Sequence, residues 1–361
     1  MSLRRRMVVG AAAALGTAAA GGAAVLQRQR VRARRLEGRS TGDFGSLRAA
    51  PLTVATSDGV RLHAEVDTVS KSSASRRDVD GDEPTLVFVH GYALNLDCWH
   101  FQRAHFRGRH TMVFYDQRSH GRSERSAKGN ATIDQLGHDL KSVLDQLVPD
   151  GRAVLVGHSM GGMSILALAE HYPELFGSRV AGVALISTTA GGLHSHRAIS
   201  PLLPDWMMSQ ITPRVIAGLA RAPGLVEGAR RAGSGIGFLL TSRFAFGDDV
   251  PASYVEFVDD MLASTSFDVI AEFFPNFDAL DKFEVLKAFE QIPTVIICGG
   301  RDMMTSIGHS RKMASRLPGA RLVECPEAGH MVILERQEQV NTALEQTIAQ
   351  AAGDSSASDV S

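Results

Sequence analysis

Residues Ala153–Gly162 read Ala-Val-Leu-Val-Gly-His-Ser-Met-Gly-Gly, and this stretch decides the fold class. Its first four residues form a continuous apolar run, which predicts a strand covered on both faces, and a helical pattern begins directly after Ser159. A serine with glycines two residues away on either side, between a strand and a helix, predicts a sharp turn that lifts the hydroxyl above the sheet. Gly157 and Gly161 are needed because strand and helix pass too closely there for side chains. We therefore predict Ser159 as a nucleophile beside the positive end of a helix.

A base and an acid for this serine follow later in the chain. A serine hydroxyl is a weak nucleophile near neutral pH, so it needs a histidine base and a carboxylate that orients the imidazole. His330 comes just after the last expected strand, and Asp302 follows a Gly-Gly-Arg turn at the end of an earlier one. Carboxyl ends of parallel strands share one edge of a sheet. We predict that Ser159, Asp302 and His330 meet there as a catalytic triad.

The loop after the first buried strand reads His90-Gly91-Tyr92. A tetrahedral intermediate of acyl transfer needs two N–H donors for its oxyanion. We assign these to the backbone of Tyr92 and of Met160, the residue after the proposed nucleophile. Gly91 lets the loop approach the substrate, and His90 is interpreted as a loop-orienting residue rather than as a catalytic one.

Apolar runs alternate with helical patterns on both sides of this motif. Leu52–Asp67 predicts two strands around a turn, and six further runs predict strands: Thr85–Val89, Thr111–Tyr115, Ala153–Val156, Val183–Ile186, Thr294–Ile297 and Arg321–Glu324. Helical patterns cover Ile133–Leu147, Met160–His171, Ser310–Leu317 and Gln337–Ala351. This alternation predicts an α/β fold, a mainly parallel eight-stranded sheet with helices on both faces.

The alternation stops between residues 191 and 291, an interval too long for one crossover. We interpret it as a helical cap inserted between two parts of the core, residues 36–190 and 292–351. Four large apolar residues of the cap are candidates to line an acyl pocket, although packing within the cap is an equal alternative for each: Trp206, Met207, Phe238 and Phe274. Residues 352–361 are small and polar and predict a disordered tail.

Taken together, these motifs resemble the α/β-hydrolase superfamily over Leu52–Ala351, and within it esterases, monoacylglycerol-lipase-like enzymes and cofactor-free haloperoxidase-like proteins. The resemblance also includes the run Asp116–Ser123, which departs from the usual family pattern by having Ser119 where glycine is common. The resemblance implies that this run is a structural turn. Asp116 also precedes the serine, so it does not fit the Ser–Asp–His chain order of the superfamily.

The composition of the chain argues against several classes of binding partner and cofactor. The 361 residues carry a formal net charge of −1, so no nucleic-acid partner is indicated. Cys98, Cys298 and Cys325 lie far apart, with no C-x-x-C pair for zinc or redox chemistry. His194 and His196 lack a further ligand cluster, so we expect neither a metal nor a cofactor. A small-molecule ester or lipid is the expected partner, and no feature fixes an oligomeric state.

The N-terminus differs from the rest of the chain. Arg4–Arg6 precede the uncharged, Ala- and Gly-rich stretch Met7–Leu26, a pattern typical of signal or anchor segments. Five arginines between Arg28 and Arg35 follow it, and by the positive-inside rule they favour a cytoplasmic position for what comes next. We predict that residues 1–35 target a membrane. Export to the cell envelope and location on the cytoplasmic face both stay open.

The main functional hypothesis is hydrolysis of a carboxylic ester with a lipophilic acyl group, through an acyl-enzyme on Ser159. One alternative keeps the triad and changes the bond, as in a C–C hydrolase or a perhydrolase of the haloperoxidase type. Another is a non-catalytic binding protein of the same fold, because fold and function are not tied.

Overall fold

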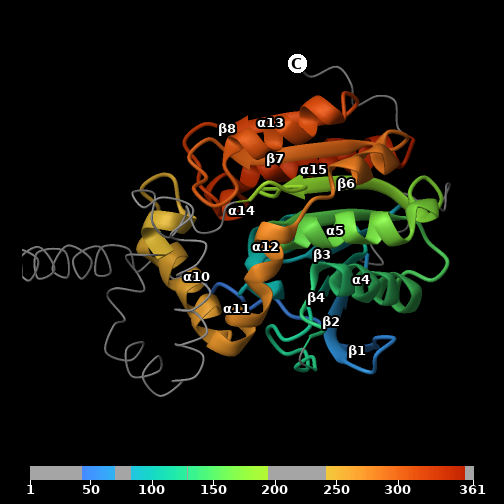
Figure 1. Ribbon diagram of the computed structural model, residues 1–361, viewed down its shortest axis with the longest axis horizontal. Helices are drawn as coiled ribbons and strands as arrows, with labels where there is room; N and C mark the ends of the chain where they lie inside the picture. The colour runs from blue at the N-terminus through green and yellow to red at the C-terminus, as the bar shows by residue number, and fades with distance from the viewer. Residues whose placement is uncertain (1–42, 70–82, 128, 194–240, 354–361) are drawn as a thin grey trace, which may run out of the picture.

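A computed structural model describes residues 43–69, 83–127, 129–193 and 241–353. Its centre is an eight-stranded sheet with the order β1-β2-β4-β3-β5-β6-β7-β8 (Figure 1). The strands are β1 (Pro51–Ala55), β2 (Arg61–Asp67), β3 (Thr85–Val89), β4 (Met112–Tyr115), β5 (Ala153–His158), β6 (Val180–Ile186), β7 (Thr294–Gly299) and β8 (Arg321–Cys325). β1 and β2 pair antiparallel, β2 pairs antiparallel with β4, and the pairs from β4 to β8 are parallel. The predicted mainly parallel eight-stranded sheet is confirmed.

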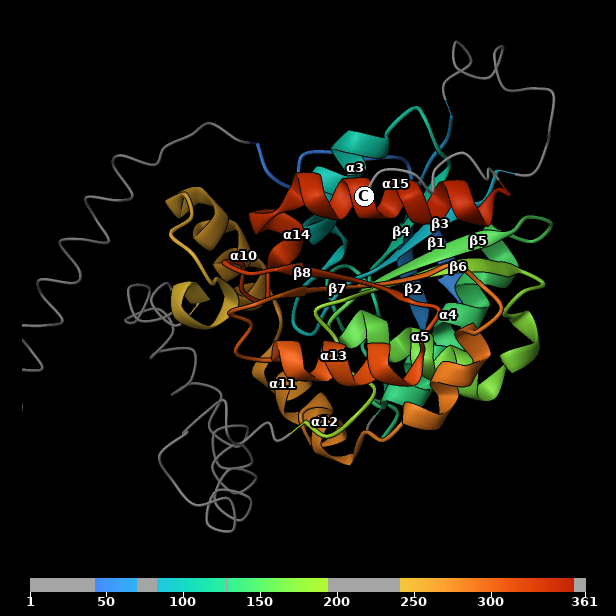
Figure 2. The same ribbon diagram turned by 90° about the horizontal axis from the view of Figure 1, so that it is seen from above.

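Helices cover both faces of the sheet, as predicted. One face carries α3 (His100–Phe106), α14 (Val332–Glu335) and α15 (Gln337–Ala351), and the other carries α4 (Ile133–Leu147), α5 (Met160–His171) and α13 (Ile307–Arg316) (Figure 2). Predicted and observed bounds agree for α4, α5 and α15. The predicted start of α13 at Ser310 was three residues late, because Gly308 in the first turn weakens the helical pattern. Short 3-10 helices lie at Leu96–Trp99, Pro173–Leu175 and Phe283–Phe289.

The core is split by the sheet into two apolar layers, and β3 shows why its sequence is apolar throughout. Leu86 and Phe88 pack into the layer beneath α3 and α15, whereas Val87 and Val89 pack into the layer beneath α4 and α5. Alternate side chains of a strand point to opposite faces, so a strand covered on both sides needs apolar residues at every position.

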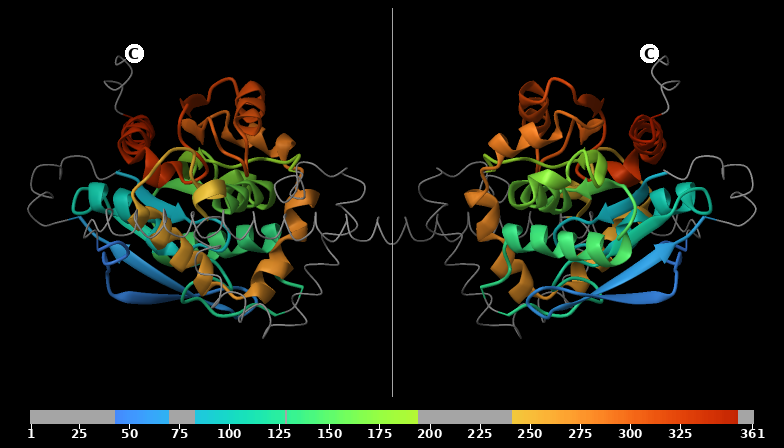
Figure 3. Two further views of the ribbon diagram at one scale, coloured as in Figure 1. Left: turned by 90° about the vertical axis from the view of Figure 1, so that its left-hand side faces the viewer. Right: turned by 90° about the vertical axis from the view of Figure 1, so that its right-hand side faces the viewer.

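Among the described residues between β6 and β7 are the α-helices α10 (Ala252–Ser264), α11 (Phe267–Phe273) and α12 (Pro275–Ala279). They lie across the end of the sheet that faces the viewer in the left view of Figure 3, where they are drawn in yellow to orange. The Thr265 hydroxyl at the end of α10 donates to the Ala93 carbonyl in the loop after β3, at 3.1 Å. These helices therefore cover the carboxyl end of the parallel strands, where the predicted site residues lie.

Some predictions fall outside the described residues. They include the membrane-targeting segment 1–35, most of the first half of the predicted cap, and most of the C-terminal tail; Ala352 and Gly353 form the turn that ends α15. Within residues 43–69, 83–127, 129–193 and 241–353, no helix is both long and apolar enough to cross a membrane.

Candidate active site

The turn at Ser159 has the strained geometry that its sequence predicts. β5 ends at His158, α5 begins at Met160, and Ser159 between them has φ 52° and ψ −119°. A Cβ at Gly157 would lie 2.7 Å from the backbone of Gly161, and a Cβ at Gly161 would overlap the carbonyl of the residue at the end of β3. Only glycine therefore fits at these two positions. The closely packed backbone around them holds Ser159 in a strained conformation that costs about 1–3 kcal/mol.

Two hydrogen bonds hold this turn against the next strand. The Ser159 N–H donates to the Ile186 carbonyl at 2.9 Å, and the Thr188 hydroxyl donates to the Ser159 carbonyl at 2.7 Å. The end of β6 therefore fixes the backbone from which the Ser159 side chain projects. Thr188 was not predicted, since nothing in its local sequence marks it as a partner of the serine turn.

His330 and Asp302 form the hydrogen bond that the triad requires. His330 Nδ1 lies 2.9 Å from Asp302 Oδ2, and both side chains are buried. Asp302 Oδ1 accepts the N–H groups of Met304 at 2.8 Å and Thr305 at 2.9 Å, and Oδ2 also accepts the Thr305 hydroxyl at 2.9 Å. Burial alone would raise the pKa of Asp302, but the charge of His330 and these hydrogen bonds bring that pKa below its ordinary value. Asp302 is thus held as a carboxylate facing the imidazole.

His158, the residue before Ser159, contacts His330 of this pair. His158 Nε2 lies 2.9 Å from the carbonyl oxygen of His330, and the two imidazole centroids are 4.9 Å apart. The three predicted triad residues therefore gather at the carboxyl ends of β5, β7 and β8, although they are as much as 171 residues apart in the chain.

The loop after β3 lies against the serine turn. A Cβ at Gly91 would lie 3.2 Å from Ser159 Cβ and 2.9 Å from His158 Nδ1, so only glycine allows this approach. Tyr92 follows Gly91, and Met160 is the first residue of α5, where backbone N–H groups lack helical acceptors. Neither N–H has a backbone acceptor among the described residues. Both are therefore free to serve as the predicted oxyanion donors.

His90 orients this loop, in agreement with the interpretation from sequence. Its Nδ1 lies 2.7 Å from the Gly91 carbonyl, and its Nε2 accepts the Gln117 N–H at 2.9 Å. The Gln117 amide returns to the His90 carbonyl at 2.6 Å. Burial lowers the pKa of His90 to about 4, so the ring is neutral near neutral pH. A neutral ring with both nitrogens in use has no capacity left for proton transfer.

An apolar cluster lies beside the oxyanion residues. Its buried members include Met160, Phe273 and Phe277, and the partly buried side chains that pack against them include Tyr92 and Phe274. The Tyr92 hydroxyl donates to the Ile270 carbonyl of α11, which ties the loop after β3 to the helices above it. Of the four residues proposed for an acyl pocket, Phe274 is in this cluster; Trp206, Met207 and Phe238 lie outside the described residues.

Asp116 is fully buried and serves a structural turn. Its two carboxylate oxygens accept the N–H groups of Leu96 at 2.7 Å and Arg122 at 2.8 Å. A Cβ at Gly121 would overlap this carboxylate, and Ser119 takes φ 66°, the conformation for which glycine is usual. In these contacts the Asp116 carboxylate accepts backbone N–H groups, whereas the hydrogen-bonded carboxylate of His330 is Asp302.

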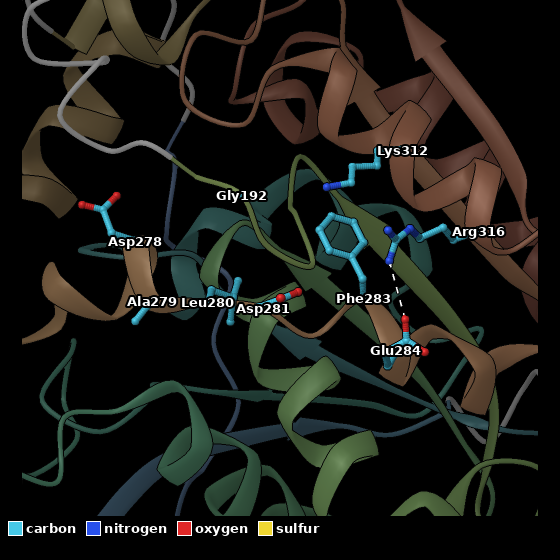
Figure 4. A pocket seen from close by; sticks show the side chains of 9 residues that line it. All are labelled: Gly192, Asp278, Ala279, Leu280, Asp281, Phe283, Glu284, Lys312 and Arg316. Carbon is cyan, nitrogen blue, oxygen red and sulfur yellow. Dashed lines mark ion pairs between the residues drawn. The ribbon is translucent and has the colours of Figure 1, made fainter. Parts of the chain in front are cut away.

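A cluster of possible metal ligands and a surface pocket also occur among the described residues, and neither contains a predicted catalytic residue. Asp134, Glu170 and His171 are close enough to share a cation, but they are exposed, and Lys282 Nζ already donates to both carboxylates. A pocket of about 510 Å³ contains none of the predicted site residues. Figure 4 shows its mixed charges, with the cations of Lys312 and Arg316 on the ring of Phe283 and several carboxylates around them.

Comparison with known proteins agrees with this geometry. Residues 84–337 match the α/β-hydrolase-fold family. The chain is 29% identical over 269 residues to 3-oxoadipate enol-lactonase 2 of Acinetobacter baylyi, covering 73% of this chain and 88% of the relative. Among solved structures, a thermophilic esterase from Thermogutta terrifontis superposes with a TM-score of 0.63 at 22% identity, covering 84% of this chain and all of the esterase. The enol-lactonase from Burkholderia xenovorans LB400 superposes with a TM-score of 0.62 at 24% identity, covering 82% of this chain and 100% of that one. The two structures, below 25% identity, support the fold.

Proposed function

The chain belongs to the α/β-hydrolase-fold family, and from that premise we propose that it hydrolyses a carboxylic ester through an acyl-enzyme on Ser159. One observation carries the proposal: the buried 2.9 Å hydrogen bond between His330 and Asp302, at the end of the sheet where Ser159 takes its strained turn. An imidazole held by a carboxylate is the base that activates a serine hydroxyl for nucleophilic attack.

The first half of the reaction forms the acyl-enzyme. Because His330 Nδ1 donates to Asp302, Nε2 is the ring nitrogen that is free to accept a proton. Ser159 Oγ attacks the ester carbonyl while its proton passes to Nε2, and Asp302 stabilises the imidazolium that results. The oxyanion accepts the N–H groups of Tyr92 and Met160. The C–O bond to the alcohol then breaks, and His330 returns its proton to the departing oxygen.

The second half releases the acid. Water attacks the acyl carbonyl, His330 Nε2 takes the water proton, and a second oxyanion forms against the same N–H donors. Collapse of this intermediate breaks the bond to Ser159 Oγ, which recovers its proton from His330. Every proton is returned within one cycle, so the reaction consumes only ester and water.

We propose a lipophilic acyl group or a lactone as the substrate. The partly buried Tyr92 and Phe274 pack against the buried apolar cluster that contains Met160, and apolar surface of this kind would remove an alkyl chain from water, at about 0.8 kcal/mol per CH₂. The similar chain from Acinetobacter is named as an enol-lactonase, and a lactone is a cyclic carboxylic ester.

Labelling with a fluorophosphonate tests the reaction. The full chain should react covalently and stoichiometrically, Ser159→Ala should not react, and Ser315→Ala, which removes an exposed hydroxyl from α13, should react as the wild type does. p-Nitrophenyl esters of graded chain length then report the substrate class, and rising kcat/KM with chain length supports a lipophilic acyl group. A folded wild-type chain that neither labels nor cleaves any of the esters would refute the proposal.

We also propose that residues 1–35 bring the hydrolase domain to a membrane. The arginines Arg4–Arg6 followed by the uncharged stretch Met7–Leu26 support this. Fractionation of cells that express the full chain should place it with membranes, whereas a chain lacking residues 1–35 should not sediment with them. Protease treatment of intact cells separates the outer face from the cytoplasmic one. A full chain found entirely in the soluble fraction would count against membrane association.

A further inference from the structure

His158, the residue before the proposed nucleophile, makes an unusual side-chain contact. It is fully buried, and its Nε2 lies 2.9 Å from the carbonyl oxygen of His330. A carbonyl oxygen can only accept, so Nε2 must carry the proton and donate it. This hydrogen bond joins residues 172 positions apart in the chain, one beside the serine and the other the base itself.

The His158 ring is also fixed by packing. Its centroid lies 4.9 Å from that of His330 and 6.4 Å, edge on, from that of Trp99. Its Nδ1 faces Gly91, where an added Cβ would lie 2.9 Å away. The ring therefore fills the space between the oxyanion loop, the serine turn and the loop that carries the base.

His158 is neutral, which favours the positive charge that His330 acquires during the proposed reaction. Burial, together with the positive charge of His330, lowers the pKa of His158 to about 3. The ring is therefore neutral over the range in which a serine hydrolase works, and it does not repel the imidazolium that forms on His330. In this neutral form Nδ1 has a lone pair without a partner in the described structure. An orphaned buried acceptor destabilises the folded state, so histidine is not the residue that stability alone would favour at this position.

We propose that His158 is a positioning residue: its Nε2–H holds the backbone of His330 at a fixed place relative to Ser159, while Asp302 fixes the rotation of the imidazole. This inference rests on the proposed hydrolase function. The two restraints are different in kind, because the Asp302 bond acts on the ring of His330 and the His158 bond acts on its main chain. Together, these two hydrogen bonds keep the imidazole of His330 at a constant position and orientation relative to Ser159.

Two substitutions separate the hydrogen bond from the packing. His158→Phe keeps an aromatic ring and removes the donor, whereas His158→Gln places an amide N–H near the position of Nε2 and removes the ring. We expect His158→Phe to lower kcat on a p-nitrophenyl ester by about 10–100-fold, the effect of misplacing reacting groups by up to 1 Å. We expect KM to change little, the rate of fluorophosphonate labelling to fall in parallel with kcat, and His158→Gln to recover most of both.

The results decide between this role and simple core packing. A kcat for His158→Phe within threefold of the wild type, or an equal loss in both variants, would overturn the proposal. If His158→Phe does not fold, His158→Asn replaces it, since its shorter amide cannot reach the His330 carbonyl; rates equal to those of His158→Gln would then overturn it. A wild-type chain that fails to label refutes the hydrolase function itself. A wild type that labels, with variants that label equally fast, refutes only the role of His158.

Discussion

Replacing Asp302 by asparagine should disable the base while leaving its surroundings in place. Asp302 Oδ1 accepts two backbone N–H groups, from Met304 and Thr305, so the amide oxygen of the variant must take that position. The amide NH₂ then replaces Oδ2 and points at His330 Nδ1, which is 2.9 Å from Oδ2 in the wild type. Two donors cannot face each other, so Nδ1 must give up its proton and become the acceptor.

The magnitude follows from this exchange of protons. With Nδ1 as acceptor, the proton of a neutral imidazole moves to Nε2, the nitrogen that should accept the proton of Ser159. We therefore expect Asp302→Asn to lower kcat by roughly 10³–10⁴-fold, or about 4–5.5 kcal/mol at about 1.36 kcal/mol per tenfold. KM should change much less, because Asp302 is buried beneath the imidazole and does not line the apolar cluster.

The assay is steady-state hydrolysis of a p-nitrophenyl ester near pH 7.5, with fluorophosphonate labelling as a second measure of Ser159 reactivity. Asp278→Asn is the matched control, since Asp278 is exposed on α12 and should leave kcat unchanged. If Asp302→Asn stays folded and its kcat is within tenfold of the wild-type value, the assignment of Asp302 as the orienting acid is wrong.

Stability against pH gives an independent check on Asp302. Its folded pKa lies below the ordinary value of 3.8, so its ionisation stabilises the fold above that value. This contribution is lost as the pH falls through the folded pKa. We expect the difference in unfolding free energy between wild type and Asp302→Asn to shrink as the pH falls below about 4. Denaturant titrations at several pH values measure it, and a difference that grows towards acid pH would contradict the reasoning.

Three further substitutions, together with Gly308→Ala as a control outside the site, test other parts of the site. Gly161→Ala forces a Cβ into the backbone at the end of β3 and should lower the free energy of unfolding by about 3 kcal/mol or more. Gly308→Ala in α13, where a Cβ has ordinary contacts, should raise that free energy by about 0.5–1 kcal/mol. Urea denaturation measures both, and equal effects would show that the close contact at Gly161 does not exclude a side chain. Thr305→Val removes the hydroxyl that donates to Asp302 at 2.9 Å and should lower kcat by about 3–10-fold and stability by about 1 kcal/mol; an unchanged kcat would mean that this hydroxyl does not help to orient the acid. Tyr92→Phe removes the hydroxyl bond to α11 but keeps the backbone N–H, so kcat on a short ester should stay within about threefold; a hundredfold loss would instead implicate the hydroxyl in catalysis.

Features that depend on neighbouring residues could be predicted from the sequence. The turn at Ser159 follows from two glycines placed between an apolar run and a helical pattern, and its strained φ of 52° agrees. The strands were found because a strand covered on both faces must be apolar along its length. Asp302 and His330 were found because each follows a predicted strand, and the carboxyl ends of parallel strands meet at one edge of the sheet.

Partners in distant loops could not be predicted in the same way. Thr305 and Thr188 have no local mark that distinguishes them from other threonines, yet one holds Asp302 and the other holds the turn at Ser159. His158 occupies the variable position of its motif, and its acceptor lies 172 residues away. Helix α3 was also missed, because seven residues give too short a pattern to separate from a loop.

Local sequence patterns are enough to predict the alternation of strands and helices, the tight turn at Ser159, and the acid and histidine that follow this serine in the chain. The contacts between loops at the end of the sheet are seen only in the folded molecule. There the oxyanion loop packs against His158, His158 donates to the carbonyl of His330, and the Tyr92 hydroxyl donates to α11. The physical reason is that backbone preferences and hydrophobic periodicity act over a few residues, whereas these contacts arise when the sheet assembles and brings distant loops together.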